Sequence, residues 1–316
     1  MNTDLTAEQR VMITFEHREA DRIPIYTHVN NISAIEAITG ASIESDPLRV
    51  CADAIRAFGI DLTSEIILPH FGIARKPLSI YQESWMNGFA VEWRGFEHWV
   101  VERPFSSLQG AYAWAVENWR PRSTVEIRDR MRRRIEARRA HQDLLGEDCL
   151  LIHQAEFISL ESIYHAIGID AFSFMMCDEP QMLADILDGM LENALRANEV
   201  LIAEDPTPVV RFGDDLAFKT GPLVSPAWLQ REYFPRQKQL ADQLKRAGIR
   251  LLFHSCGNIT PLIPALLDLG IDALQPLEVT AGVDLADLKR RYGQRLVLMG
   301  NVDTNVIQMG TPEEVR

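Results

Sequence analysis

The chain has few cysteines and no long apolar run for its 316 residues. Its four cysteines are spread widely, which excludes a small disulfide-stapled domain and is typical of reduced thiols. No apolar stretch approaches the roughly 18 residues of a membrane span. The opening residues lack the basic and apolar regions of a secretory signal. We therefore predict a cytoplasmic protein without a membrane segment.

Positive charge is also scarce, with 32 Lys and Arg against 45 Asp and Glu, a net charge of −13. A field of this sign repels nucleic acids and anionic lipids, so we expect neither as the main partner. The sequence lacks a P-loop, a nucleophile elbow and an H-E-x-x-H helix, and no G-x-G-x-x-G follows an early strand. The composition, 47% apolar and 24% charged, is that of a globular protein and leaves a small-molecule substrate as the expected ligand.

Short apolar runs alternate with longer helix-like segments along the chain. The runs predict seven strands, at residues 22–29, 61–67, 149–156, 208–215, 250–256, 272–278 and 295–303. The segments 179–204, 226–248 and 260–270 have helical spacing or helix start and stop signals. Such alternation predicts parallel strands joined by crossovers, in a (β/α)₈ barrel or in an open doubly wound sheet.

Polar residues gather where the predicted strands end, which is where barrel enzymes carry their chemistry. They are His28, Glu65, Glu156, Asp214, Asp215, His254, Cys256, Glu278, Asn301 and Asp303. An open sheet uses the same edge, but its dinucleotide-binding form has no glycine fingerprint here, so we favour a single α/β domain, a (β/α)₈ TIM barrel over residues 1–316. The sequence stops in what resembles the opening turn of a helix, so we expect the last strand and helix to be missing from this chain.

Two segments depart from the alternation. Residues 85–105 carry two turn signals, Asn87-Gly88 and Arg94-Gly95, between aromatic-rich alternating stretches, which predicts an antiparallel insertion. Between Arg120 and Arg139 there are nine arginines and three acidic residues, which predicts an Arg-rich helix near 122–142. That helix is either a solvated face or a docking surface for an acidic partner or RNA.

The sharpest local feature is His254-Ser255-Cys256, at the end of a strongly apolar predicted strand. Residues i and i+2 of a strand point to one face, so an imidazole and a thiolate can reach the same cation. Zinc takes nitrogen and sulfur ligands and needs three or four in total. Glu278, which ends the next strand, is better placed as a further ligand than Cys177. The alternative is an inert buried cysteine.

Four further residues are candidates for acid–base chemistry or for holding a substrate. Asp214 and Asp215 end one predicted strand, and the alternative for this pair is a helix-capping aspartate beside a lysine-paired one. Glu65 and Tyr164 are similar candidates, and local sequence does not assign their roles.

Longer stretches of the chain resemble the uroporphyrinogen decarboxylase superfamily. They are RVMITFEHREADRIPI at 10–25, GDDLAFKTGPLVSP at 213–226, LLFHSCGNITPLIPALLDLGIDALQPLE at 251–278 and LMGNVDTNVIQMGTPEEVR at 298–316. The resemblance implies a (β/α)₈ barrel. It also implies one of two activities, that of the porphyrinogen decarboxylases or that of the zinc-dependent corrinoid methyltransferases.

The decarboxylase branch has an Arg-Gln-Ala-Gly-Arg run after its first strand, but residues 27–31 here read Thr-His-Val-Asn-Asn. Its catalytic aspartate, in a Ser-Asp-Ile-Leu context, is replaced by Glu65. Its tyrosine, four residues before a glycine, matches Tyr164. The missing cationic run makes this branch the weaker match.

The methyltransferase branch binds zinc through a His-x-Cys motif and a second, distant cysteine, and His254 and Cys256 match the motif. The second cysteine falls beyond residue 316, and Glu278 lies near a position that supplies an oxygen ligand in that branch. The resemblance therefore implies a zinc-dependent methyltransferase that moves a methyl group between a corrinoid, carried by a partner protein, and a small thiol or folate. The alternatives are a decarboxylase-like lyase using Glu65 and Tyr164, and a non-catalytic barrel that binds a partner through the Arg-rich helix.

Overall fold

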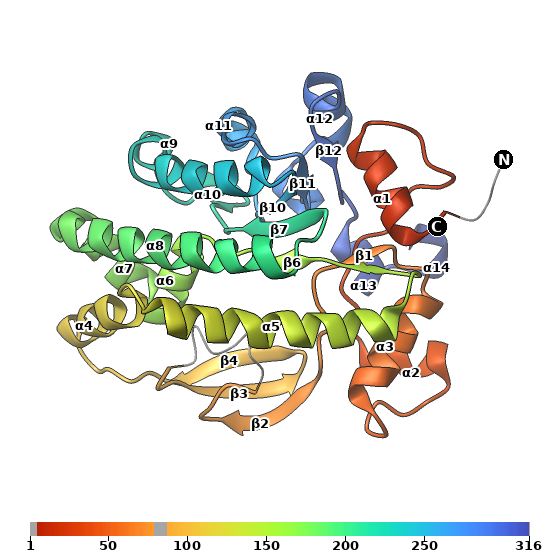
Figure 1. Ribbon diagram of the computed structural model, residues 1–316, viewed down its shortest axis with the longest axis horizontal. Coiled ribbons are helices and arrows are strands. Elements are labelled where there is room, and N and C mark those ends of the chain that lie inside the picture. Colours follow the sequence, from red (N-terminus) through yellow and green to blue (C-terminus); the bar gives the residue numbers. More distant parts are fainter. Residues whose placement is uncertain (1–4, 79–86, 316) are drawn as a thin grey trace.

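A computed structural model describes residues 5–78 and 87–315 of the chain (Figure 1). Trp85 and Met86, at the start of the predicted insertion, lie outside the described residues, as does Arg316. The strands are β1 Leu62–Thr63, β2 His70–Ala74, β3 Ala90–Gly95, β4 Glu97–Glu102, β5 Leu150–Leu151, β6 His153–Gln154, β7 Val209–Gly213, β8 Ala217–Phe218, β9 Gly221–Pro222, β10 Arg250–His254, β11 Ala273–Gln275 and β12 Val297–Leu298.

The parallel strands follow one another in chain order, as they do in a (β/α)₈ barrel. One sheet has the order β6-β7-β10-β11-β12, and β5, one residue before β6, pairs with β1. Tyr26 adds a parallel bridge to Leu62 on the other side of β1. Each of the seven predicted strands therefore has a counterpart, shorter than its apolar run, and the predicted barrel fold is confirmed. An eighth parallel strand of the barrel is not found within residues 5–78 and 87–315.

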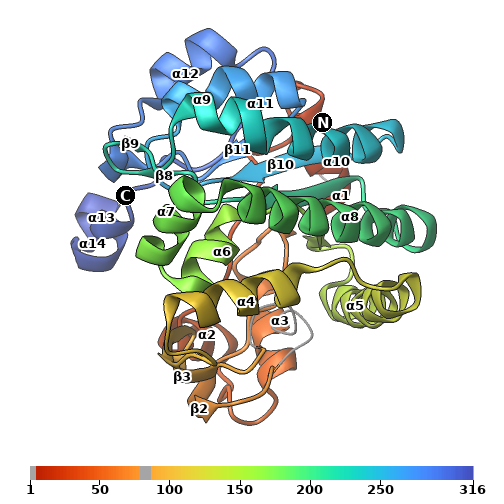
Figure 2. The ribbon, with the colours of Figure 1, turned by 90° about the vertical axis from the view of Figure 1, so that its left-hand side faces the viewer.

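Helices connect these strands and surround them (Figure 2). They are α1 Ala7–Phe15, α2 Ile32–Thr39, α3 Pro47–Ala57, α4 Leu108–Trp119, α5 Thr124–Leu145, α6 Leu160–Ile167, α7 Ile169–Asp178, α8 Pro180–Glu204, α9 Pro226–Trp228, α10 Phe234–Arg246, α11 Ile263–Leu269, α12 Leu285–Tyr292, α13 Thr304–Met309 and α14 Pro312–Val315. A π-helical turn, Leu229–Tyr233, joins α9 to α10, so the predicted helix 226–248 is a single helix with a bulge. Short 3₁₀ turns cover Thr260–Leu262 and Val279–Ala281.

The interior of the barrel changes from apolar to polar along the strands. A buried layer joins Leu62, Ile152, Val209, Leu252, Ala273 and Val297, and Val11 and Phe15 of α1 pack against it. Side chains alternate along a strand, so the residues two positions later share the interior. On four neighbouring strands these are Gln154, Arg211, His254 and Gln275. The polar layer lies at the carboxyl ends of the strands, where barrel proteins place their sites.

The segment between β1 and α4 forms a separate antiparallel sheet, in the order β2-β3-β4. It lies at the opposite end of the molecule from α11 and α12 (Figures 1 and 2). The sheet includes β2, which the alternation around residues 85–105 does not indicate. The Trp93 ring lies between the rings of His70 and His98, with centroids 5.2 and 4.5 Å away, and His98 is also its register partner.

The Arg-rich segment contains α5, which begins at a capping box formed by Ser123 and Glu126 and packs along α8 (Figure 1). At least six of its nine arginines form ion pairs with carboxylates of the described residues. Arg120 pairs with Glu117, Arg130 and Arg134 with Glu156, Arg132 with Glu204, and Arg138 and Arg139 with Asp205. These guanidinium groups therefore lie against carboxylates of the same chain, four carboxylates for the six arginines.

The pairing of Asp205 gives a test of stability against pH. Its carboxylate accepts hydrogen bonds from Arg138 at 2.6 Å and from His153 at 2.8 Å. Burial raises the pKa of Asp205, but these two partners outweigh burial and bring it well below its ordinary value. The contribution is therefore present above the unfolded pKa of about 4 and is lost as the pH falls toward the folded pKa. We expect Asp205→Asn to cost about 3–5 kcal/mol of unfolding free energy at pH 7 and clearly less at pH 2.

Urea denaturation at the two pH values measures this difference. Asp53→Asn is the matched control, because Asp53 forms an exposed pair with Arg56 that is expected to contribute below about 1 kcal/mol. Equal losses in the two variants at pH 7 would contradict the role given to Asp205.

The helices of the described segments include none with both the length and the apolar character needed to cross a membrane.

Candidate metal centre

The ends of β7 and β10 bring three potential metal ligands together. The two strands pair in parallel, with His254 opposite Gly213, and the Asp214 N–H donates to the His254 carbonyl at 3.0 Å. Continuing from these ends, the chain places Asp215 beside Cys256, whose N–H donates to Asp215 Oδ1 at 2.8 Å. The parallel register is thus what unites residues 215, 254 and 256.

The side-chain donors of Asp215, His254 and Cys256 lie within 4.8 Å of one another. His254 Nε2 is 3.7 Å from Cys256 Sγ and 3.5 Å from Asp215 Oδ1. Zinc–ligand bonds of about 2.0–2.3 Å in a tetrahedron place neighbouring donors about 3.3–3.8 Å apart. Both separations from His254 Nε2 fall in that range, so the nitrogen is placed to share a zinc ion with the sulfur and with the oxygen.

His254 is ready to bind a cation at pH 7, whereas Cys256 must first lose its proton. Burial, with the nearby charge of Arg211, lowers the pKa of His254 to about 4, so its imidazole is neutral at pH 7 and can donate a lone pair. Burial raises the pKa of Cys256 to about 12, and the negative charges of Asp215 and Glu278 add to this. Without a cation Cys256 is therefore a thiol, and a cation bound between these groups favours its thiolate.

Two glycines make room for the centre. A Cβ on Gly213 would lie 2.3 Å from the carbonyl oxygen of His254. Gly257, the residue after Cys256, has φ +79°, and its Cβ would lie 2.3 Å from the carbonyl oxygen of Ala217. Only glycine allows both the left-handed backbone and the close approach at position 257, so the segment after β10 can pack directly against β8.

Glu278, predicted as a further zinc ligand, is not in the group of three. Its carboxylate accepts the Gly257 N–H at 2.8 Å and the Thr280 hydroxyl at 2.6 Å, and these hydrogen bonds lower its pKa. Glu278 therefore supports the loop that carries Cys256. Cys177, the other candidate, is exposed on α7 and also lies outside the group.

Asp214 and Asp215 have different surroundings. Asp214 is fully buried and accepts the Leu160 and Glu161 N–H groups at 2.7 and 2.8 Å. It therefore caps the start of α6, as the helix-capping alternative for this pair expects. Asp215 is partly exposed and faces His254 and Cys256, so one of the two neighbours has a structural position and the other belongs to the candidate ligand group.

Tyr164 and Glu161, both on α6, hold the backbone of Asp215. The Tyr164 hydroxyl donates to the Asp215 carbonyl at 3.1 Å, and the Asp215 N–H donates to Glu161 Oε2 at 3.3 Å. Burial raises the pKa of Tyr164, which keeps its hydroxyl protonated. Tyr164 was predicted as a site residue, whereas Glu161 was missed because nothing in its local sequence indicates that α6 starts beside β7.

Glu65 lies on the other side of the barrel mouth, close to a residue that the sequence analysis missed. Burial raises the pKa of Glu65, and the charge of Arg211 opposes this. Arg211 donates to Gln154 Oε1 at 3.3 Å, and no carboxylate lies within ion-pair distance of it in the described segments. An arginine inside the apolar strand 208–215 was the available signal for this inward-facing cation.

Comparisons with known proteins bear on the family and the fold. Residues 160–316, about half of the chain, match the family model described as uroporphyrinogen decarboxylase (URO-D). A solved structure of a methyltransferase from Methanosarcina mazei is 18% identical, with a TM-score of 0.62, and the match covers 95% of this chain and 83% of that one. Comparison with curated proteins gives no match.

At 18% identity the structural likeness establishes the fold and nothing finer. The matched family segment contains α6, Asp214, which accepts hydrogen bonds from the start of α6, and the ends of β7 and β10 with Asp215, His254 and Cys256. The strand order of the barrel, the similar solved structure and the family match agree, and we conclude that the chain belongs to the uroporphyrinogen decarboxylase family.

Proposed function

We propose that this protein is a zinc-dependent methyltransferase that moves a methyl group between a corrinoid and a small thiol. The observation that carries the proposal is the group of Asp215, His254 and Cys256, whose donor separations of 3.5 and 3.7 Å suit one tetrahedral cation. Three protein ligands leave a position for an acceptor. Zinc held there lowers the pKa of a bound thiol, which makes it a nucleophile at neutral pH.

The surrounding residues have supporting tasks in this proposal. Tyr164 and Glu161 fix the Asp215 backbone, and Glu278 fixes the loop after β10, so Asp215 and Cys256 are held from outside. Arg211, a cation in the polar layer beside His254, favours an acceptor that carries an anionic group. The corrinoid is expected on a separate carrier protein, and the reaction is expected in the cytoplasm.

Zinc content and methyl transfer test the proposal together. Purified protein is assayed for bound metal and for loss of methylcobalamin absorbance in the presence of small thiols. We expect about one zinc per chain and thiol-dependent demethylation, and a drop of more than about 100-fold in activity with loss of the metal in Cys256→Ser. Cys177→Ser, at an exposed cysteine outside the group, is the matched control and is expected to retain both.

Two outcomes would count against the proposal. Stoichiometric zinc that persists in Cys256→Ser would place the metal elsewhere. Absence of zinc from the wild-type protein, with activity on a carboxylated substrate, would favour the lyase alternative that uses Glu65.

A further inference from the structure

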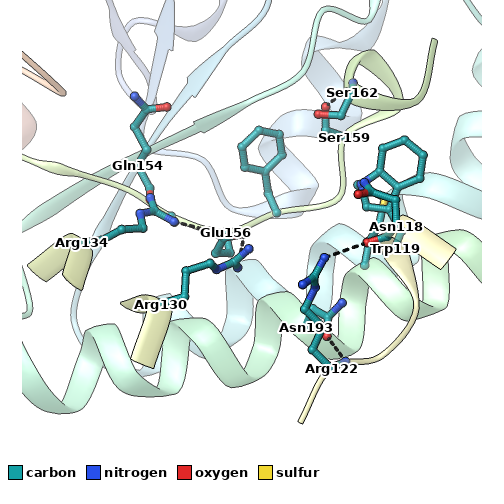
Figure 3. Close-up of a pocket in the computed structure, with 13 residues that line it drawn as sticks. Asn118, Trp119, Arg122, Arg130, Arg134, Gln154, Glu156, Ser159, Ser162 and Asn193 are labelled. Atoms are coloured by element: carbon teal, nitrogen blue, oxygen red, sulfur yellow. Dashed lines mark hydrogen bonds and ion pairs between the residues drawn. The ribbon is translucent and has the colours of Figure 1, made fainter. Parts of the chain in front are cut away.

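Apart from the candidate metal centre, the protein has a cavity among α4, α5, α8 and the segment that follows β6 (Figure 3). It has a volume of about 310 Å³, at the lower end of the range for small-molecule sites. Its lining does not include Asp215, His254 or Cys256. Figure 3 shows Arg130 and Arg134 on one side of the cavity, Trp119 on the opposite side, and Arg122 at its edge.

The charge of this cavity is unlike that of the whole chain. Three guanidinium groups line it, and one carboxylate, Glu156, so the local formal charge is 3 − 1 = +2 in a chain of −13. Burial raises the pKa of Glu156, but Arg130 and Arg134 outweigh burial and bring it below its ordinary value. Glu156 is therefore ionised at pH 7 and neutralises only one of the two arginines that share it.

Two of the arginines that line the cavity are not fully satisfied by partners within the described part of the chain. Arg130 contacts Glu156 Oε2 at 3.2 Å through Nη2, and its buried Nε makes no hydrogen bond. Arg122 donates to the Asn118 carbonyl at 3.2 Å, and the ion pairs of the described ranges do not include it. These partly buried guanidinium groups have less negative charge beside them than they carry, and their fork of donors matches a phosphate or carboxylate.

We propose that this cavity binds a small phosphate monoester with an apolar body. A phosphate monoester carries a charge close to −2 at neutral pH, which balances the excess of +2, and it accepts several guanidinium hydrogen bonds at once. The apolar body lies against Trp119, Phe157 and Met190, which line the same cavity. The site is independent of the proposed metal chemistry, since it shares no ligand residue with it.

Calorimetric titration with phenyl phosphate, in a buffer free of phosphate, tests the proposal. We expect saturable binding with a dissociation constant of about 1 mM or below. Arg130→Gln is expected to weaken it about tenfold, because a charge-assisted hydrogen bond is lost while the Arg134–Glu156 pair remains. Arg132→Gln is the matched control, on the same helix but in an exposed pair with Glu204, and is expected to bind as the wild type does.

Two further variants keep the test decisive. If Arg130→Gln does not fold, Arg122→Gln, which lies outside α5, replaces it in the titration. The same tenfold loss of affinity for phenyl phosphate is expected. Cys256→Ser is expected to bind phenyl phosphate normally, which separates this site from the metal centre. Failure of the wild type to bind, equal losses in Arg130→Gln and Arg132→Gln, or equally tight binding of the monoanion benzoate would each overturn the proposal.

Discussion

Replacing Asp215 with asparagine is expected to lower zinc affinity by more than about 100-fold, which exceeds the effect usual for a residue outside the ligand sphere. The variant keeps an oxygen that accepts the Cys256 N–H, now 2.8 Å from Asp215 Oδ1, so the loop geometry is preserved. What is lost is the negative charge of that oxygen, which also lies 3.5 Å from His254 Nε2. Competition with a chromogenic zinc chelator measures the affinity directly.

The zinc affinity of Glu278→Gln is the comparison for that of Asp215→Asn. Glu278 was expected from sequence as the third ligand, whereas its carboxylate accepts the Gly257 N–H and the Thr280 hydroxyl. A glutamine retains an acceptor for one of these bonds, so we expect a loss of about tenfold only. A larger loss in Glu278→Gln than in Asp215→Asn would reverse the assignment of the third ligand.

Gly257→Ala is expected to destabilise the protein by about 3 kcal/mol and to abolish stoichiometric zinc binding. The added Cβ would lie 2.3 Å from the Ala217 carbonyl oxygen, and the backbone has φ +79°. The loop must move away from β8, and Cys256 moves with it. Thermal unfolding gives the stability, and metal analysis of the folded fraction gives the zinc content.

Gly270→Ala separates backbone strain from collision. Gly270 also has a positive φ, +99°, but open space surrounds the position of its Cβ. Its substitution is expected to cost about 1–2 kcal/mol from strain alone and to leave zinc binding intact. If both variants retained zinc equally, the close approach of the β10 loop to β8 would not matter for the centre.

The succession of strands and helices in the barrel was predictable because each element is marked by a local sequence pattern. Runs such as 250–256 are apolar enough to be buried on both faces, and they are separated by helix signals such as Ser225-Pro226 and Gly270. The strand ends were less predictable. Residues 295–303 form a strand only over Val297–Leu298, because the number of paired residues depends on the neighbouring strand.

The arginine-rich segment shows the opposite case. Its sequence predicts a helix, but the partners of the arginines lie far along the chain. Arg138 pairs with Asp205 and Arg134 with Glu156, and these contacts exist only because α5 packs against α8 and the end of β6. A charge count therefore could not decide between a docking surface, a solvated face and the internal pairing that the structure has.

The sequence by itself determined the alternation of strands and helices. Its spacing of two predicted that His254 and Cys256 lie together, as they do, although β10 ends at His254 and Cys256 follows it. Only the tertiary structure decided which third residue faces them. Asp214 and Asp215 are neighbours with the same side chain, yet one caps α6 and the other reaches the metal-facing position. That choice depends on the parallel register of β7 and β10 and on where α6 begins, and both are set by packing between segments distant in the chain.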